Sequence, residues 1–119
     1  MQKPGFHAID LRKGRYSKNN RIYLVTTTTQ QRQKVFTDFP LGRLVVHAMR
    51  QQHQHEKVNS LAFVIMLDHI HWLFSLQNDS KLAEVMRSVK GRSARQIQQI
   101  RRERGEITEK QALWDAIWL

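Results

Sequence analysis

Two histidines separated by one isoleucine, His69-Ile70-His71, are the residues of this chain best placed to do chemistry. They lie inside the segment 64–74, whose β-branched and aromatic residues are typical of a buried strand. Because side chains of a strand alternate between its two faces, the two imidazoles should project from one face, about 7 Å apart. Ile70, Trp72, Phe74 and Leu76 should then point the other way, toward a core. At that spacing the two rings could share one divalent metal ion.

The histidine pair has a neighbouring residue that could support it as a metal site. Asp68 precedes it directly, and a carboxylate beside a histidine ligand commonly orients the ring. Two nitrogens do not hold a catalytic metal alone, so a third ligand is needed. The alternative is that one histidine makes a hydrogen bond in the core while the other lies at an exposed edge. Two imidazoles without partners would be costly among apolar residues, which favours the metal interpretation.

A second pair, His53 and His55, looks similar in the sequence but falls at the glutamine-rich end of a predicted helix. Residues two apart on a helix do not face each other. His47 and His55 do share a helical face, but that face lies opposite the apolar one. We therefore expect these histidines to be exposed to solvent and to bind no metal.

The charge balance indicates the class of partner. Lys and Arg number 20 against 10 Asp and Glu, a net charge of +10. A domain this basic favours a polyanion, first nucleic acid and second an anionic membrane. The absence of cysteine excludes disulfides, thiolate zinc sites and a cysteine nucleophile. Neither a membrane-spanning segment nor a signal peptide is recognisable, so we expect a cytoplasmic protein with no membrane association.

The basic residues that we expect to contact DNA phosphates form two groups. The group before the first predicted strand consists of Arg12, Lys13, Arg15 and Arg21. The group along the second long predicted helix consists of Arg87, Lys90, Arg92 and Arg95. The alternative for the helix is a solvated face, although acidic residues are scarce there. Aromatic residues that could stack on unpaired bases are Tyr16, Tyr23, Trp72 and Trp114, the two tryptophans being better explained as core.

The predicted elements that position these residues alternate between strands and helices. Residues 1–20 form an irregular basic lead-in, and Asp38 and the segment 78–80 offer caps for two helices. The strands are predicted at 21–29, 58–66, 69–76 and 112–119, and the helices between 38 and about 51 and from 80 to 104. The order β-α-β-β-α-β predicts one α+β domain over residues 1–119, ferredoxin-like, with an antiparallel sheet and two long helices.

With these motifs in place, the chain resembles the REP-associated tyrosine transposases and their insertion-sequence relatives, which act on single-stranded DNA through a His-hydrophobic-His motif. The resemblance rests on the segment Met66 to Leu73, on Met86-Arg87-Ser88-Val89-Lys90-Gly91 and on Leu113-Trp114, and spans nearly the whole chain. Leu67 stands where the family commonly has proline, which removes no metal ligand.

The resemblance implies that His69 and His71 hold Mg²⁺ or Mn²⁺ against a scissile phosphate, with Asp68 supporting them. It also implies a tyrosine nucleophile on a helix after the last strand, followed by an amide that completes the metal site. This chain stops at Leu119 inside that strand, and its tyrosines are Tyr16 and Tyr23. We therefore expect weak metal binding and no strand cleavage by this chain alone.

The partner implied by the resemblance is single-stranded or hairpin DNA, bound by a monomer or a homodimer. The alternative is a nucleic-acid-binding module without a catalytic role, either a remnant of the same family or an RNA-binding domain of like topology. Metal titration separates the two, because catalytic ancestry predicts that both His69 and His71 respond.

Overall fold

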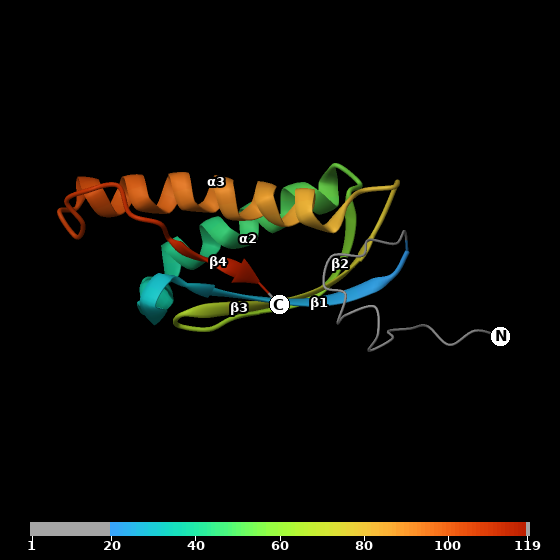
Figure 1. The fold of residues 1–119 in the computed structure, drawn as a ribbon, viewed down its shortest axis with the longest axis horizontal. Helices are drawn as coiled ribbons and strands as arrows, with labels where there is room; N and C mark the ends of the chain where they lie inside the picture. Colours follow the sequence, from blue (N-terminus) through green and yellow to red (C-terminus); the bar gives the residue numbers. More distant parts are fainter. Residues whose placement is uncertain (1–19, 119) are drawn as a thin grey trace.

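The computed structural model describes residues 20–118, which form a four-stranded antiparallel sheet with two long helices on one face. Figure 1 shows the helices above the sheet and no described helix or strand below it. The strands lie in the order β2-β3-β1-β4, which is the ferredoxin-like order. The predicted α+β fold class is therefore confirmed. The elements are β1 (Ile22–Thr29), α2 (Phe39–Gln54), β2 (Val58–Ile65), β3 (His69–Leu76), α3 (Leu82–Glu103) and β4 (Trp114–Trp118).

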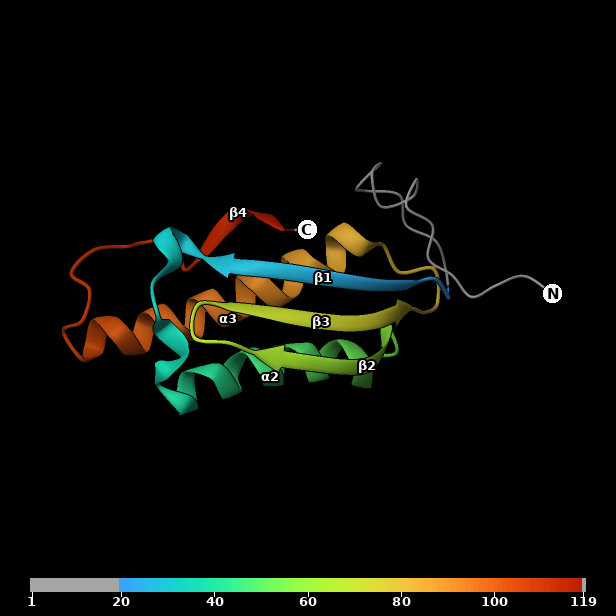
Figure 2. The ribbon, with the colours of Figure 1, turned by 90° about the horizontal axis from the view of Figure 1, so that it is seen from below.

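The alternation of β3 divides its residues between the core and the open face of the sheet. Ile70, Trp72, Phe74 and Leu76 point toward the helices and are completely buried. On β1 the residues Tyr23, Val25 and Thr27 are buried in the same way. The remaining, alternate side chains of these strands lie on the opposite face of the sheet. Figure 2 views the sheet from that face, with β1 and β3 at its centre.

Strand β2 forms one edge of the sheet and contains an irregularity. Its pairing with β3 shifts between Ser60 and Ala62, so one extra residue enters the edge strand. Ser60 lies opposite Phe74 before the shift, and Phe63 lies opposite Trp72 after it. Both therefore point to the helix side, where the Trp72 indole Nε1 donates a hydrogen bond to Ser60 Oγ at 2.9 Å.

One predicted capping side chain, Asp38, does not cap its helix. Asp38 is the N-cap of α2 but makes no side-chain cap hydrogen bond, because its carboxylate is paired with Arg104 instead. The segment 78–80, which was predicted to offer a cap for the second long helix, lies just before α3. Asn78 and Asp79 have positive φ angles of 53° and 58° and form a turn, and α3 begins after Lys81.

The other end of α3 follows the prediction. Gly105 comes just after the helix with φ of 76°, a conformation in which glycine is least strained. Two short 3-10 turns between β1 and α2, η1 (Gln30–Arg32) and η2 (Val35–Thr37), were not predicted. Within residues 20–118, no helix combines the length and apolar character that a membrane span requires.

Candidate metal and nucleic-acid site

His69 and His71 lie next to each other on the open face of the sheet. Their ring centroids are 4.9 Å apart, and the ring planes are nearly perpendicular at 81°. On the neighbouring strand β1, Thr28 lies opposite His69 and Thr26 lies opposite His71. Both histidines are half-buried, so neither is enclosed in the core. The alternative, in which one histidine makes a hydrogen bond in the core and the other lies at an exposed edge, is therefore wrong.

His69 is held by a carboxylate that is itself held by an arginine. The Nδ1 atom of His69 lies 2.7 Å from Asp68 Oδ1, and Arg32 Nε donates to Asp68 Oδ2 at 2.9 Å. The hydrogen bond from Arg32, followed by the one from His69, lowers the pKa of Asp68 from 3.8 to about 2. An ionised Asp68 can only accept, so Nδ1 of His69 carries the proton. In the neutral ring Nε2 then keeps its lone pair.

His71 is held by a neutral partner. Its Nδ1 atom lies 2.8 Å from the hydroxyl Oγ1 of Thr26. A threonine hydroxyl can donate or accept, so it accommodates either tautomer of the ring. Because Thr26 lies directly opposite His71 in the sheet, the register of β1 against β3 produces this contact.

The two histidines therefore use Nδ1 for protein contacts and have Nε2 left for another ligand. No hydrogen bond within residues 20–118 occupies either Nε2 atom. An imidazole fixed through one nitrogen and open at the other is the usual state of a metal-binding histidine. The pair could thus supply two nitrogen ligands to a divalent ion. A cluster of three or more His, Cys, Asp or Glu residues able to hold a metal is not found in the described part of the chain.

Two residues of this site were missed in the sequence. Thr26 belongs to a run of four threonines, Thr26 to Thr29, and its alternation with Thr27 could have placed it on the histidine face. Arg32 gave no comparable signal. It reaches Asp68 from η1, a turn in which Gln31 and Arg32 both adopt left-handed φ angles of 57° and 56°.

Three of the four aromatic side chains considered for base stacking are buried. Tyr23, Trp72 and Trp114 are at most 5% exposed and belong to the core on the helix side of the sheet. The suggestion for Tyr23 was therefore wrong, because Tyr23 lies opposite the buried Phe74, and the assignment of the two tryptophans to the core is confirmed. Tyr16 lies outside the described residues. The aromatic residues with large exposed fractions are instead Phe39, at 71%, and Phe63, at 46%.

The predicted DNA-contacting residues that the structure describes, Arg21 and the cations of α3, do not surround the histidine pair. Arg12, Lys13 and Arg15 lie outside the described residues. Arg21 lies at the far end of β1, where its carbonyl accepts a hydrogen bond from the Leu76 amide. Since His69 is opposite Thr28, the length of the strand separates Arg21 from the pair.

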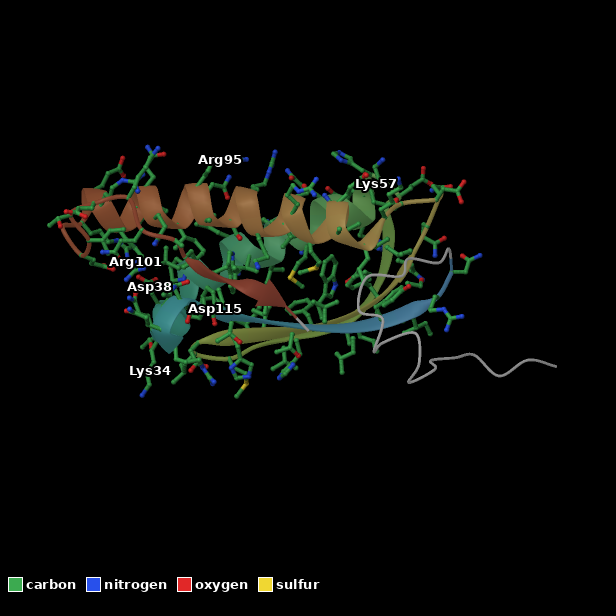
Figure 3. The ribbon with its side chains drawn as sticks, viewed as in Figure 1. Lys34, Asp38, Lys57, Arg95, Arg101 and Asp115 are labelled. Carbon is green, nitrogen blue, oxygen red and sulfur yellow. The ribbon has the colours of Figure 1, made fainter. Side chains whose placement is uncertain are left out.

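The predicted cations of α3 lie on the helix side of the sheet. Arg87, Arg92 and Arg95 are exposed, and Figure 3 shows Arg95 on the side of α3 that faces away from the sheet. Lys90 differs from them, because its Nζ donates to the carbonyl oxygen of Asp115 on β4 at 2.7 Å. Burial lowers the pKa of Lys90. Lys90 thus links α3 to β4, and the three arginines form a separate basic surface.

The second histidine pair has no shared site. His53 accepts a hydrogen bond through Nδ1 from the backbone amide of Ser60 at 3.1 Å, which links the end of α2 to β2. His55 caps the helix at its C-terminal end and is exposed.

Comparison with known proteins gives a family match over almost the whole chain. Residues 17–118 match the family model described as "Transposase IS200 like". A search of curated proteins finds no match.

Two solved structures share the fold. One is a REP-associated tyrosine transposase bound to a REP hairpin, with a TM-score of 0.63 and 15% sequence identity over 88% of this chain. This chain spans only 57% of that transposase. The other is a candidate transposase from Deinococcus radiodurans R1, with a TM-score of 0.68 and 20% identity, covering 89% of this chain and 81% of the other.

Proposed function

The chain belongs to the family of IS200-like transposases, as its histidine motif predicted, and we propose that it binds single-stranded or hairpin DNA with a backbone phosphate at the histidine pair. One observation supports this proposal most strongly. His69 and His71 lie side by side on an open sheet face, each fixed through Nδ1. The net charge of +10 and the DNA-bound structural neighbour agree with a DNA partner.

The residues around the pair would keep it ready for a divalent ion. Asp68 keeps the proton of His69 on Nδ1, so that Nε2 stays available, and Arg32 keeps Asp68 in place. Thr26 fixes the ring of His71. Bound Mg²⁺ or Mn²⁺ would neutralise charge on the phosphate oxygens and orient them. With two imidazoles and no third such ligand among residues 20–118, we expect this binding to be weak.

DNA cleavage would require a nucleophile on the same face of the sheet. Tyr23 cannot serve, because its ring lies on the helix side, 3% exposed and 6.4 Å from the ring of Phe74. We therefore propose DNA and metal binding for residues 20–118. Strand cleavage through a phosphotyrosine link would need a tyrosine supplied by residues outside that range.

The exposed arginines of α3 would act separately. Arg87, Arg92 and Arg95 would contact phosphates of DNA that continues around the sheet, without reading its sequence. Such contacts would make the affinity fall steeply as salt concentration rises.

The test of this proposal is a Mn²⁺ titration followed by NMR, because the paramagnetic ion broadens signals of nearby side chains. We expect the imidazole signals of His69 and His71 to broaden first. The variants His69→Ala and His71→Ala should lose this binding, whereas His55→Ala, which removes the exposed histidine that follows α2, should retain it. Equal broadening of all histidines, or unchanged binding in both pair variants, would refute a metal site here.

A second candidate function is DNA binding without any metal. It is favoured because no group of three His, Cys, Asp or Glu residues that could hold a metal is found within residues 20–118, and Asp68 is bonded to Nδ1 of His69 instead. The affinity for a hairpin oligonucleotide with an unpaired tail, measured with Mn²⁺ and with EDTA, separates the two. The metal proposal predicts tighter binding with Mn²⁺ in the wild type and no difference in His71→Ala. The second candidate predicts no difference in either protein.

A further inference from the structure

A groove between helix α2 and the edge strand β2 takes no part in the site described above. It consists of two adjoining hollows of about 440 Å³ and 220 Å³, which have Val46, Arg50 and Phe63 in common. We call it the α2–β2 groove. Its principal lining residues are Phe39, Arg43, Val46, His47 and Arg50 on α2 and Phe63 on β2.

The groove results from two local features of the sequence. On α2, Phe39, Arg43, Val46 and Arg50 follow one another at intervals of three or four residues, so they lie along one side of the helix. On β2, the shift in pairing between Ser60 and Ala62 brings Phe63 to the helix side of the sheet. The aromatic ring of the strand and the cations of the helix thus line the same groove.

Both aromatic rings of the groove are accessible. Phe39 is 71% exposed and Phe63 is 46% exposed, whereas most other large apolar side chains among the described residues are buried in the core. The guanidinium of Arg43 lies 5.8 Å from the ring centre of Phe39, over its face. Exposed aromatic rings beside cations are the usual means of binding unpaired bases, since every base has a flat face on which a ring can stack.

The charge of the groove has one sign. Its charged lining residues are Arg43 and Arg50, and none of its lining residues is acidic. Neither Arg43 nor Arg50 has a carboxylate partner within residues 20–118. Other arginines of the domain do have one: Arg32 is paired with Asp68, and Arg104 with Asp38. The groove is therefore complementary to an anionic ligand.

We propose that the α2–β2 groove binds a segment of unpaired DNA, whose bases stack on Phe39 and Phe63 and whose phosphates contact Arg43 and Arg50. The proposal rests on the proposed function, which makes DNA the ligand. A duplex does not fit this chemistry, because its bases are stacked on one another and offer no free face to the two rings.

The position of the groove suggests which part of the DNA it holds. Phe63 and Val64 are consecutive residues of the edge strand and point to opposite faces, and Val64 lies opposite His71. One strand thus separates the groove from the histidine pair. DNA with a phosphate at the pair can pass over the free edge of β2 and continue into the groove, which then binds the nucleotides flanking that phosphate.

The experiment measures binding of fluorescent oligonucleotides to the wild-type chain and to groove variants. The probes are an oligothymidylate about 12 nucleotides long, its RNA counterpart, and a blunt hairpin without unpaired ends. Phe39→Leu and Phe63→Leu keep an apolar side chain at an exposed position and remove the ring. Phe39→Trp keeps an aromatic ring at the same position. Arg43→Ala and Arg50→Ala remove the cations, and Lys81→Ala removes an exposed cation before α3 as a matched control.

We expect each leucine variant to weaken oligothymidylate binding about 5- to 100-fold, in line with the loss of one stacked base, and Phe39→Trp to bind at least as tightly as the wild type. Each arginine variant should lower the slope of log affinity against log salt by about 0.7, and Lys81→Ala should leave it unchanged. Binding of the blunt hairpin should be unaffected by all of them.

Three outcomes overturn the proposal. If the leucine variants bind oligothymidylate like the wild type while DNA binding persists, the groove is not used and the proposed function still stands. If the wild type binds no DNA at all, the proposed function and the groove proposal both fail. If the RNA probe, or a polyglutamate competitor, binds to the groove more tightly than oligothymidylate, unpaired DNA is not its ligand.

Discussion

Removing the carboxylate of Asp68 should weaken metal binding by the histidine pair. Asp68 accepts from Nδ1 of His69 at 2.7 Å and is held in turn by Arg32 at 2.9 Å. In Asp68→Ala the ring of His69 loses its fixed orientation and its fixed tautomer, so Nε2 is no longer kept free. Such supporting partners are typically worth 10- to 100-fold in metal affinity, or about 1.4–2.7 kcal/mol.

The size of the effect should follow the chain of contacts. Asp68→Asn keeps an oxygen that can accept from Nδ1 but removes the charge, so its loss should be smaller than that of Asp68→Ala. Arg32→Ala should have the smallest effect, since Arg32 acts only through Asp68. Glu84→Ala removes an exposed carboxylate in the first turn of α3 and serves as the control.

The assay is a Mn²⁺ titration of each variant at neutral pH, followed by broadening of the imidazole signals, with thermal unfolding as a check on folding. The predicted order of affinity is wild type and Glu84→Ala, then Arg32→Ala, Asp68→Asn and Asp68→Ala. An affinity of Asp68→Ala within twofold of the wild type would refute the supporting role of Asp68.

Three further predictions concern the same sheet. The pKa of Asp68 is lowered to about 2, so its contacts stabilise the fold above its ordinary pKa of 3.8 and are lost as pH falls toward 2. In urea denaturation, the wild type should therefore be more stable than Asp68→Asn at about pH 5 and equally stable at about pH 1.5. Thr26→Val should weaken Mn²⁺ binding less than Asp68→Ala does in the same titration, because the contact of Thr26 with His71 is uncharged; an equal or larger loss would contradict this. Trp72→Ala should lower the free energy of unfolding by about 3–5 kcal/mol, measured by urea denaturation, because Trp72 is completely buried and bonded to Ser60; a loss below about 1 kcal/mol would show that the core repacks around the cavity.

The sequence was most informative where a pattern is local. The alternation along 69–76 predicted both the buried residues Ile70, Trp72 and Phe74 and the shared face of the two histidines, because the period of a strand determines both. The order of strands and helices was predictable for the same reason. Each element has its own period, and short connections leave few arrangements.

Features that depend on distant residues were not predictable. Asp38 looked like a helix cap, but Arg104, which is 66 residues away in the chain, competes for its carboxylate. Arg32 reaches Asp68 only because Gln31 and Arg32 adopt left-handed backbone angles, which non-glycine residues rarely do. No propensity of these residues indicates that turn.

The α2–β2 groove illustrates the same limit. Strict alternation from Val58 would turn Phe63 to the open face of the sheet, where it would lie beside the histidines. The extra residue between Ser60 and Ala62 reverses this and puts Phe63 on the helix side. A single inserted residue thus changes the face of every later side chain in the strand, and the sequence carries no mark of its position.

The most direct test of the central claim is a crystal structure of the chain with a hairpin oligonucleotide and Mn²⁺, using the anomalous signal of manganese. We predict one strong peak within coordination distance of Nε2 of both His69 and His71, with a DNA phosphate oxygen beside it. A manganese peak at other histidines, or DNA bound with no manganese at the pair, would contradict the account.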